Sequence, residues 1–285
     1  MTTDRPNNRT NYHSHCSFCD GKAPMEDFVE EAVRQGFAAY GISSHAPLPF
    51  PARWTLEAER MAAYLAEIDR LKAAYADRIE LYAGLEIDYL NEQSNPASDY
   101  FQKLPLDYRI GSVHLLHSTQ GEIVDIDTRP EVFREHVRLH LGGDLKRVVL
   151  AYFDKLMRMI GRGGFDFIGH ADKISYNVSC CEPDILGQQW YKDKISEYFT
   201  FIAEKGAMIE VNTKTLHRNG FLYPNKEHFG LIRTLGIPVV VNSDAHLPEL
   251  INSGRPEALR LLKASGIGAV WQLERGVWTE VPIGE

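Results

Sequence analysis

Short apolar runs rich in β-branched residues alternate along this chain with longer amphipathic stretches. This alternation is typical of repeated β-α-β units, whose strands pair in parallel and whose helices cover the sheet. The expected strands are Thr10–His15, Ala38–Ser44, Glu80–Ile87, Tyr108–Leu115, Phe165–Gly169, Ala207–Asn212 and Pro238–Ser243, with Ala269–Leu273 as an eighth strand or an edge strand. The expected helices are Pro24–Gln35, Leu56–Ala76, Arg134–Ile160 with a break at Gly142-Gly143, Gln188–Glu204, Lys226–Thr234 and Pro256–Ala264. Seven or eight such units fit a closed α/β barrel better than an open sheet.

The length of the chain also fits one barrel. Its 285 residues lie within the range over which α/β barrels form one domain, and we find no internal repeat and no linker rich in Pro, Gly or Ser. We therefore expect residues 1–285 to form a single domain. Three irregular stretches, at 46–53, 91–99 and 176–183, follow strand-end segments, so they can be substrate loops or plain connectors.

Composition excludes several classes of protein. The chain is 44% hydrophobic and 25% charged, as in an ordinary globular protein, and its net charge of −8 comes with no Lys/Arg run that could follow a nucleic-acid backbone. We find no apolar window of 18 residues and no secretory signal in the polar N-terminal segment, so we expect a cytoplasmic protein without a membrane partner. Cys16, Cys19, Cys180 and Cys181 are expected to be free thiols, because they match neither a disulfide framework nor a four-thiolate zinc module.

Histidines and carboxylates gather at the carboxyl ends of the expected strands. In a parallel barrel these ends open on one face, so residues far apart in sequence meet there. Imidazole and carboxylate are the ligand types of Zn²⁺, Mn²⁺ and Fe²⁺, so the pattern predicts a metal site. The strand-end residues are His13, His15, His45, Glu86, His114, His170, Glu210, Asp244 and His246.

Two pairs with a spacing of two residues strengthen this prediction. His13 and His15, and likewise Asp244 and His246, each lie on one side of an extended segment, because side chains repeat every second residue of a strand. Each pair can therefore reach one metal ion or two neighbouring ions. Asp20, in the sequence CDG after the first strand, can be a further ligand or can simply form the turn into the next helix.

The motifs that carry these residues resemble those of the PHP family, which is named for DNA polymerase and histidinol phosphatase. In order along the chain they are HSH followed by CDG at 13–21, GISSH at 41–45, GLEIDY at 84–89, GSVH at 111–114, IGHADK at 168–173 and NSDAH at 242–246. The resemblance runs from about residue 10 to residue 246. IEVNTK followed by Arg218, together with SVHLL, resembles the histidinol phosphatase branch more than the polymerase branch.

The resemblance implies a distorted (β/α)7 barrel, similar to a TIM barrel, with three divalent metal ions, either Zn, Mn or Fe, at the carboxyl ends of the strands. It implies that Glu86 bridges two of the ions and that Glu86, Asp244 and His246 are catalytic. Some relatives have histidine near position 20, so Asp20 could alter the metal preference. The three implied ligand sets are His13, His15, Glu86 and Asp244; Asp20, His45 and His246; and Glu86, His114 and His170.

The resemblance also implies a reaction, the hydrolysis of L-histidinol phosphate to L-histidinol and phosphate. Metal ions would activate water and neutralise the phosphate oxygens, and basic side chains would complete the phosphate site. Lys173 and Arg218 are the best candidates for that role and Arg255 is third, although each could be a solvated surface charge. Glu210 or Asp172 could bind the amine and imidazole of the substrate, and Glu210 could instead support a metal ligand. We expect a small phosphorylated substrate as the partner of a monomer or homodimer.

Other functions remain as alternatives. A PHP phosphoesterase could act on another small phosphate ester or a nucleotide, or could be a non-catalytic or nucleic-acid-processing module, which the acidic charge balance disfavours. A metal-dependent amidohydrolase also uses an HxH pair and a late aspartate, but it would need about two metals and not Asp20, His45 and His246. The Asp125–Thr128 segment resembles the nucleophile motif of haloacid-dehalogenase-type phosphatases, but Arg129 stands where Thr or Val belongs, so we expect a turn there.

Overall fold

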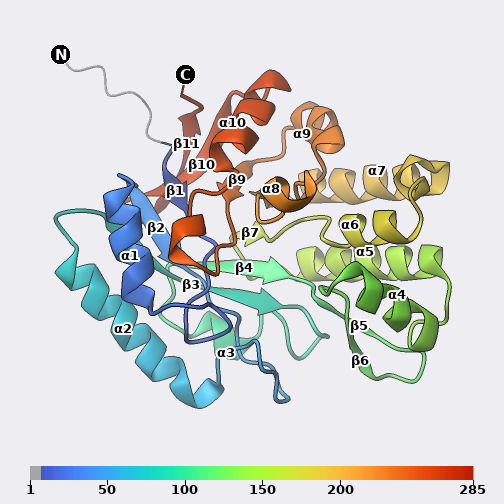
Figure 1. The fold of residues 1–285 in the computed structure, drawn as a ribbon, viewed down its shortest axis with the longest axis horizontal. Helices are drawn as coiled ribbons and strands as arrows, with labels where there is room; N and C mark the ends of the chain where they lie inside the picture. Colours follow the sequence, from blue (N-terminus) through green and yellow to red (C-terminus); the bar gives the residue numbers. More distant parts are fainter. Residues whose placement is uncertain (1–7, 285) are drawn as a thin grey trace.

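The computed structural model describes residues 8–284 and contains a sheet of seven parallel strands. The strands follow one another around the sheet in the order β1-β2-β3-β4-β7-β8-β9 (Figure 1). Their bounds are β1 Thr10–Asn11, β2 Ala39–Ile42, β3 Glu80–Asp88, β4 Tyr108–Ser112, β7 Phe167–Ile168, β8 Met208–Asn212 and β9 Val239–Asn242. Because each new strand joins the same edge of the growing sheet, the chain builds a barrel in sequence order.

The barrel closes between its first and last strands. Ser14 and Ala245 form a parallel bridge just beyond β1 and β9, and the His15 amide donates to the Ala245 carbonyl at 2.8 Å. Closer to the strands, the Tyr12 amide donates to the Asn242 side chain at 2.8 Å, so a side chain replaces part of the backbone ladder. The prediction of a distorted seven-stranded barrel is therefore confirmed.

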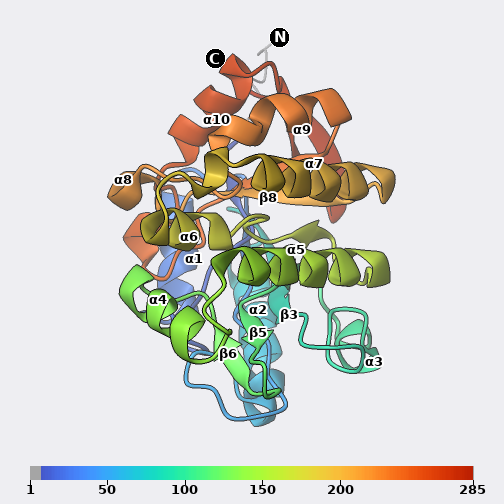
Figure 2. The same cartoon turned by 90° about the vertical axis from the view of Figure 1, so that its right-hand side faces the viewer.

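Helices cover the barrel on its outside (Figure 1), and Figure 2 shows α5 and α7 crossing it side by side. They form where apolar residues recur on one face, as in α5, whose buried face includes Val149, Phe153 and Leu156. None of the described helices is long and apolar enough to cross a membrane. The α-helices are α1 Met25–Arg34, α2 Met61–Ala74, α3 Asp99–Gln102, α4 Pro130–Leu139, α5 Leu145–Arg162, α6 Ile174–Cys181, α7 Gln189–Glu204, α8 Leu216–Asn219, α9 Phe229–Leu235 and α10 Arg255–Ala264. Short 3-10 helices lie at Ala58–Arg60, Ile185–Gly187, Lys226–His228 and Pro248–Leu250.

Two helical regions bear on the sequence predictions. The break at Gly142-Gly143 is confirmed, since both glycines have positive φ (81° and 73°) between α4 and α5. The irregular stretch expected at 176–183 is wrong, because most of it belongs to α6. Buried Ile174 and Val178, four residues apart, give that short helix an apolar side to pack.

The C-terminal segment does not supply an eighth barrel strand. Ala269–Glu274 and Val277–Pro282 form an antiparallel hairpin, β10 and β11, as a separate two-stranded sheet. The hairpin packs against the amino end of the barrel, where the Leu273 amide donates to the Tyr12 hydroxyl at 2.9 Å and Trp278 Nε1 donates to Asp166 Oδ1 at 3.0 Å. It therefore covers the barrel end opposite the histidine-bearing strand ends.

A second hairpin follows the fourth barrel strand. That strand ends at Ser112, and Leu115–His117 (β5) pairs antiparallel with Ile123–Asp125 (β6). The Ile126 amide then donates to the His114 carbonyl at 2.9 Å. The segment after β6 is thereby held beside His114 at the carboxyl ends of the strands.

Tyr108, on β4, fills the middle of the barrel and requires glycine at Gly41 on β2 and at Gly84 on β3. A Cβ at Gly84 would lie 2.2 Å from its fully buried ring, and a Cβ at Gly41 would lie 2.3 Å from its hydroxyl oxygen and 2.8 Å from the ring. The hydroxyl itself donates to the Tyr12 carbonyl at 2.6 Å. Side chains at these two positions would collide with a rigid ring rather than with a flexible chain end.

We therefore expect Gly84→Ala to lower the free energy of unfolding by about 1–3 kcal/mol or more, as overpacking does in other cores. Urea unfolding followed by circular dichroism measures this loss. Gly230→Ala is the matched control, because a Cβ on this exposed glycine of α9 would meet no atom within 4 Å. Equal stability of the two variants would contradict the role assigned to the Tyr108 packing.

Candidate metal centre

All nine predicted metal ligands lie together at the carboxyl ends of the barrel strands. Seven of them are almost completely buried, and only the side chains of Asp20 and His246 are partly exposed, at 29% and 18%. Four overlapping groups of three or four of these residues have donor atoms within 4.8 Å of one another. The strand-end argument thus brings eight of these side chains together, and Asp20 joins them from the loop after β1.

Glu86, on β3, stands at the centre of the cluster. Ser112 donates a hydrogen bond of 2.7 Å to its Oε1. The two oxygens of Glu86 lie 2.9–3.5 Å from ring nitrogens of five histidines, which are His13, His15, His45, His114 and His170. A carboxylate shared in this way has the geometry of a bridge between cations.

Asp244 adds a second buried carboxylate to the cluster, and Asp20 extends the cluster toward solvent. Asp244 Oδ1 lies 3.2 Å from His15 Nε2 and 3.9 Å from His13 Nε2. Asp20 Oδ1 lies 3.3 Å from His246 Nε2 and 3.8 Å from His45 Nε2. We call His15, Asp20, His45 and His246 the outer group and His13, His15 and Glu86 the inner group. In both groups the donor atoms lie within 4.8 Å of one another.

The backbone is strained at two of these residues. His170 and Asp244 have positive φ values of 30° and 50°, in the left-handed region that favours glycine. Such conformations cost about 1–3 kcal/mol each and persist where the surrounding structure imposes them. Here they turn the two side chains into the cluster at the ends of β7 and β9.

The unpaired polar atoms test whether a metal would fit. His13 Nε2, His15 Nε2, His45 Nδ1, Glu86 Oε2 and Asp20 Oδ1 are buried and have no hydrogen-bond partner. Buried polar atoms are normally paired, so a convergent set of unpaired lone-pair donors is suited to binding a cation. Mixed imidazole and carboxylate donors suit divalent ions of the zinc and manganese class, and the residues present therefore fit such ions.

Two of the histidines are oriented by carboxylates that bind their Nδ1 atoms. His13 Nδ1 donates to Glu210 Oε1 at 2.7 Å, and His114 Nδ1 donates to Asp88 Oδ2 at 3.0 Å. Each hydrogen bond places the proton on Nδ1 and so leaves the Nε2 lone pair for a metal ion. Asp88 was not predicted from the sequence, although it lies two residues after Glu86 on the same strand.

Glu210 corrects one prediction. The expectation that it contacts substrate is wrong, because its side chain is completely buried and both oxygens are used within the protein. Besides His13, it accepts from the His170 amide at 2.8 Å and from the side chains of Asn212 and Asn242 at 3.0 and 2.9 Å. The alternative role, support of a metal ligand, agrees with these contacts. Asp172 is also fully buried and accepts from the Asn225 amide at 2.9 Å.

Charge is strongly coupled within the cluster. Burial alone would lower the pKa of His13, but Glu210, Glu86 and Asp244 outweigh it and raise that pKa well above its usual value. Burial, with His45 and His246 nearby, lowers the pKa of His15 instead. Burial would raise the pKa of Glu86, yet the surrounding histidines lower it well below its usual range. The carboxylates of the cluster are therefore kept ionised, as metal ligands must be.

The predicted phosphate-binding cations are in three different situations. Lys173 is buried, with its Nζ 3.2 Å from Asp127 Oδ2 and above the ring of Tyr223. Arg218 is exposed on α8. Arg255 corrects the sequence expectation, since it is 2% exposed and donates to the carbonyls of Val241 and Asn8 at 3.2 and 2.9 Å. Those contacts make Arg255 a structural residue behind β9.

Two residues at the mouth of the cluster were missed by sequence reasoning. Lys214 Nζ lies 3.1 Å from Asp244 Oδ1 while its side chain stays one-third exposed. Its position two residues after β8, at the end of the IEVNTK motif, was the available signal. Trp54, in the loop after β2, is partly buried with its ring centroid 4.8 Å from His45 and 5.8 Å from His114. These residues add a cation and an aromatic wall to the metal face.

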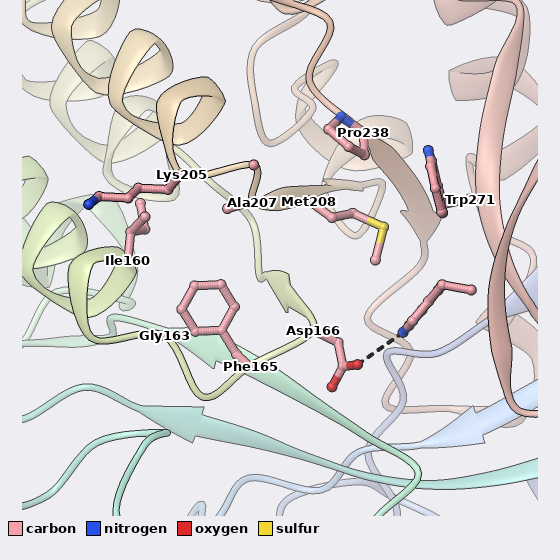
Figure 3. A pocket seen from close by; sticks show the side chains of 11 residues that line it. Ile160, Gly163, Phe165, Asp166, Lys205, Ala207, Met208, Pro238 and Trp271 are labelled. Atoms are coloured by element: carbon pink, nitrogen blue, oxygen red, sulfur yellow. Dashed lines mark hydrogen bonds between the residues drawn. The ribbon is translucent and has the colours of Figure 1, made fainter.

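A separate cavity of about 320 Å³ lies at the opposite end of the barrel (Figure 3). Phe165, Met208 and Pro238 line it at the amino ends of β7, β8 and β9, together with Trp271 of the C-terminal hairpin. Asp166, one of its charged residues, is already bonded to Trp278 (Figure 3). The candidate metal ligands lie at the other end, in the histidine cluster.

Comparison with known proteins agrees with the site geometry. A family model described as the PHP domain matches residues 11–214. The chain is 26% identical over 283 residues to a Schizosaccharomyces pombe protein named "Probable histidinol-phosphatase", covering 93% of this chain and 89% of that protein. It is 25% identical to a Bacillus subtilis histidinol-phosphatase, covering 82% and 92% of the two chains. A Lactococcus lactis histidinol phosphate phosphatase, solved with zinc, L-histidinol and phosphate, has a similar fold, with a TM-score of 0.70 at 18% identity over 95% of this chain and 99% of that one.

Proposed function

Because this chain belongs to the PHP domain family, we propose that it is a metal-dependent phosphatase that hydrolyses L-histidinol phosphate to L-histidinol and phosphate. The observation that carries the proposal is Glu86, whose two oxygens face five histidine rings with unpaired donor atoms around them. The substrate is taken from relatives that match this chain over most of their length.

The proposed ligands form three sets around three divalent ions, either Zn, Mn or Fe. Glu86 belongs to two of the sets and is the proposed bridge. Bound ions of this kind supply a water nucleophile at neutral pH and neutralise the charge on phosphate oxygens. The sets are His13, His15, Glu86 and Asp244; Asp20, His45 and His246; and Glu86, His114 and His170.

Other residues of the chain orient the metal ligands and bind the substrate. Glu210 and Asp88 fix the tautomers of His13 and His114, and Ser112 holds the Glu86 carboxylate. Lys214, partly exposed beside Asp244, is a proposed phosphate-binding residue, whose ammonium group would neutralise further negative charge on the phosphoryl oxygens. Trp54, beside His45 and His114, offers an aromatic surface to the imidazole of the substrate.

We also propose that residues 1–285 act as a single domain, as a monomer or homodimer, in the cytoplasm. Free thiols at all four cysteines support a reducing compartment.

A panel of phosphate monoesters tests the substrate. We expect kcat/KM for L-histidinol phosphate to exceed that for p-nitrophenyl phosphate and for nucleoside monophosphates by about two orders of magnitude or more. The reason is that contacts with the imidazole and amine of histidinol add to the binding of the phosphate group, which all these substrates share. A panel without preference for histidinol phosphate would reject this substrate but leave a general phosphoesterase. Hydrolysis of amides rather than phosphate esters, with about two metals bound, would favour the amidohydrolase alternative.

The phosphate-binding cations give a further prediction. Removing the charge by Lys214→Met or Arg218→Met should raise KM by about tenfold or more while lowering kcat less, because a charged hydrogen bond contributes roughly 1.5–3 kcal/mol. Arg260→Met is the control, since Arg260 is exposed on α10 and pairs only with Glu257 in the ion pairs of the described chain. A loss confined to kcat would mean that the contact forms in the transition state, and an unchanged kcat/KM would remove that residue from the phosphate site. Lys173→Met should also reduce stability, because it leaves Asp127 without its partner.

A further inference from the structure

His15 differs from His13 and His114 in the group that holds its ring. Its Nε2 faces the cluster, 3.2 Å from Asp244 Oδ1 and 3.5 Å from Glu86 Oε2. Its Nδ1 lies 3.6 Å from the sulfur of Cys19. Where His13 and His114 have carboxylates behind them, His15 has a thiol.

The chain folds back specifically to bring Cys19 there. The Cys19 amide donates to the Cys16 carbonyl at 3.0 Å, and the Ser17 amide donates to the Ala23 carbonyl at 2.9 Å, which closes a compact loop after the HSH segment. A Cβ at Gly21 would lie 2.0 Å from the His15 carbonyl oxygen, so the loop can approach His15 only because residue 21 is glycine. The Lys22 amide then donates to the His246 carbonyl at 2.8 Å and ties the loop to the segment after β9.

We propose that Cys19 is a positioning residue for His15, whose sulfur accepts the Nδ1–H hydrogen bond and thereby directs the Nε2 lone pair toward the metal ions. The proposal rests on the metal-binding part of the proposed function and not on the identity of the substrate. His15 lies between the inner and the outer donor groups, so its orientation affects both. Neutral sulfur is a weaker hydrogen-bond acceptor than a carboxylate oxygen. His15 is therefore held more loosely than His13 and His114. Metal binding by His15 depends on the hydrogen bond from its Nδ1 to the Cys19 sulfur.

Titration of metal-free protein with Zn²⁺, in competition with a chromophoric chelator, tests the proposal without any phosphatase assay. Cys19→Val removes the acceptor at nearly the same volume and should weaken Zn²⁺ binding by about 10–100-fold, the usual effect of losing a group that orients a ligand. Cys19→Ser should restore most of the affinity, because a hydroxyl also accepts from Nδ1–H. Cys180→Ser, on α6, is the matched control and should bind Zn²⁺ as the parent protein does.

A double-mutant cycle separates positioning from a general structural effect. If Cys19 acts through His15, Cys19→Val should add little to the loss already caused by His15→Ala. Additive losses in the double variant, or unchanged Zn²⁺ affinity in Cys19→Val, would overturn the proposal. If Cys19→Val fails to fold, failure of Cys19→Ser to outperform Cys19→Ala in Zn²⁺ affinity would also overturn it. Parent protein that binds no Zn²⁺ would reject the metal centre itself, whereas tight Zn²⁺ binding without histidinol phosphate turnover would reject only the substrate.

Discussion

Replacing Glu86 with alanine is expected to lower kcat by at least about three orders of magnitude and to reduce the metal content of the purified protein. The reason is geometric, since both oxygens of Glu86 lie within 3.5 Å of histidine nitrogens on two sides of the cluster. Loss of a single histidine removes a donor from one part of the cluster, but loss of Glu86 removes the shared donor and its negative charge. Steady-state kinetics and elemental analysis of the same preparation measure both effects.

Two comparisons control for general damage. Ser112→Ala removes only the hydrogen bond to Glu86 Oε1 and should cost far less activity than Glu86→Ala. His45→Ala removes one candidate ligand and should fall between the two. A Glu86→Ala protein that keeps three metal ions and a near-normal kcat would show that Glu86 is not the bridge.

Stripping the protein of metal should have an effect of similar size. We expect turnover of L-histidinol phosphate to fall by several orders of magnitude after dialysis against a strong chelator and to return with Zn²⁺ or Mn²⁺. Thermal stability should fall as well, because a ligand present at 1,000 times its Kd stabilises the folded state by about 4 kcal/mol. Activity assays and differential scanning calorimetry record the two losses.

A control for this experiment is chelator already saturated with the same metal, which should leave both activity and stability intact. Full turnover by protein that elemental analysis shows to be free of metal would contradict metal-dependent catalysis.

The sequence predicted the barrel well because its signals are local and repeated. Seven apolar runs separated by amphipathic stretches overlap the seven barrel strands, and the strand-end residues met as expected because parallel strands point the same way. The strands are nevertheless shorter than predicted at β1 and β7. The expected first strand continued through His13 and His15, whereas regular pairing stops at Asn11 and the side chains of His13 and His15 enter the cluster.

The C-terminal hairpin shows a signal that was available but not used. Arg275 and Gly276 both have positive φ, 51° and 76°, as a two-residue hairpin turn of type I′ requires. A glycine between two β-rich runs predicts such a turn, and it would have identified β11 as the partner of β10.

Residue roles that depend on burial and distant partners could not be predicted. Arg255 looks like a free cation in sequence, but the fold buries it against the carbonyls of Val241, on β9, and Asn8, near the N-terminus. Glu210 was placed correctly on its strand, yet only the structure reveals that His13 occupies one of its oxygens. Cys19 had no assigned role, because its contact with His15 depends on how a short loop folds back.

Anomalous diffraction from crystals grown with Mn²⁺ or Zn²⁺ tests the central claim most directly, because it locates each ion without assuming any role for a residue. The account predicts three peaks at the carboxyl ends of the barrel strands, with Glu86 between two of them, His15 and Asp244 beside the first and Asp20 and His246 beside the outermost. Crystals soaked with metal that show no anomalous peak within this cluster, or peaks only at other residues, would contradict it.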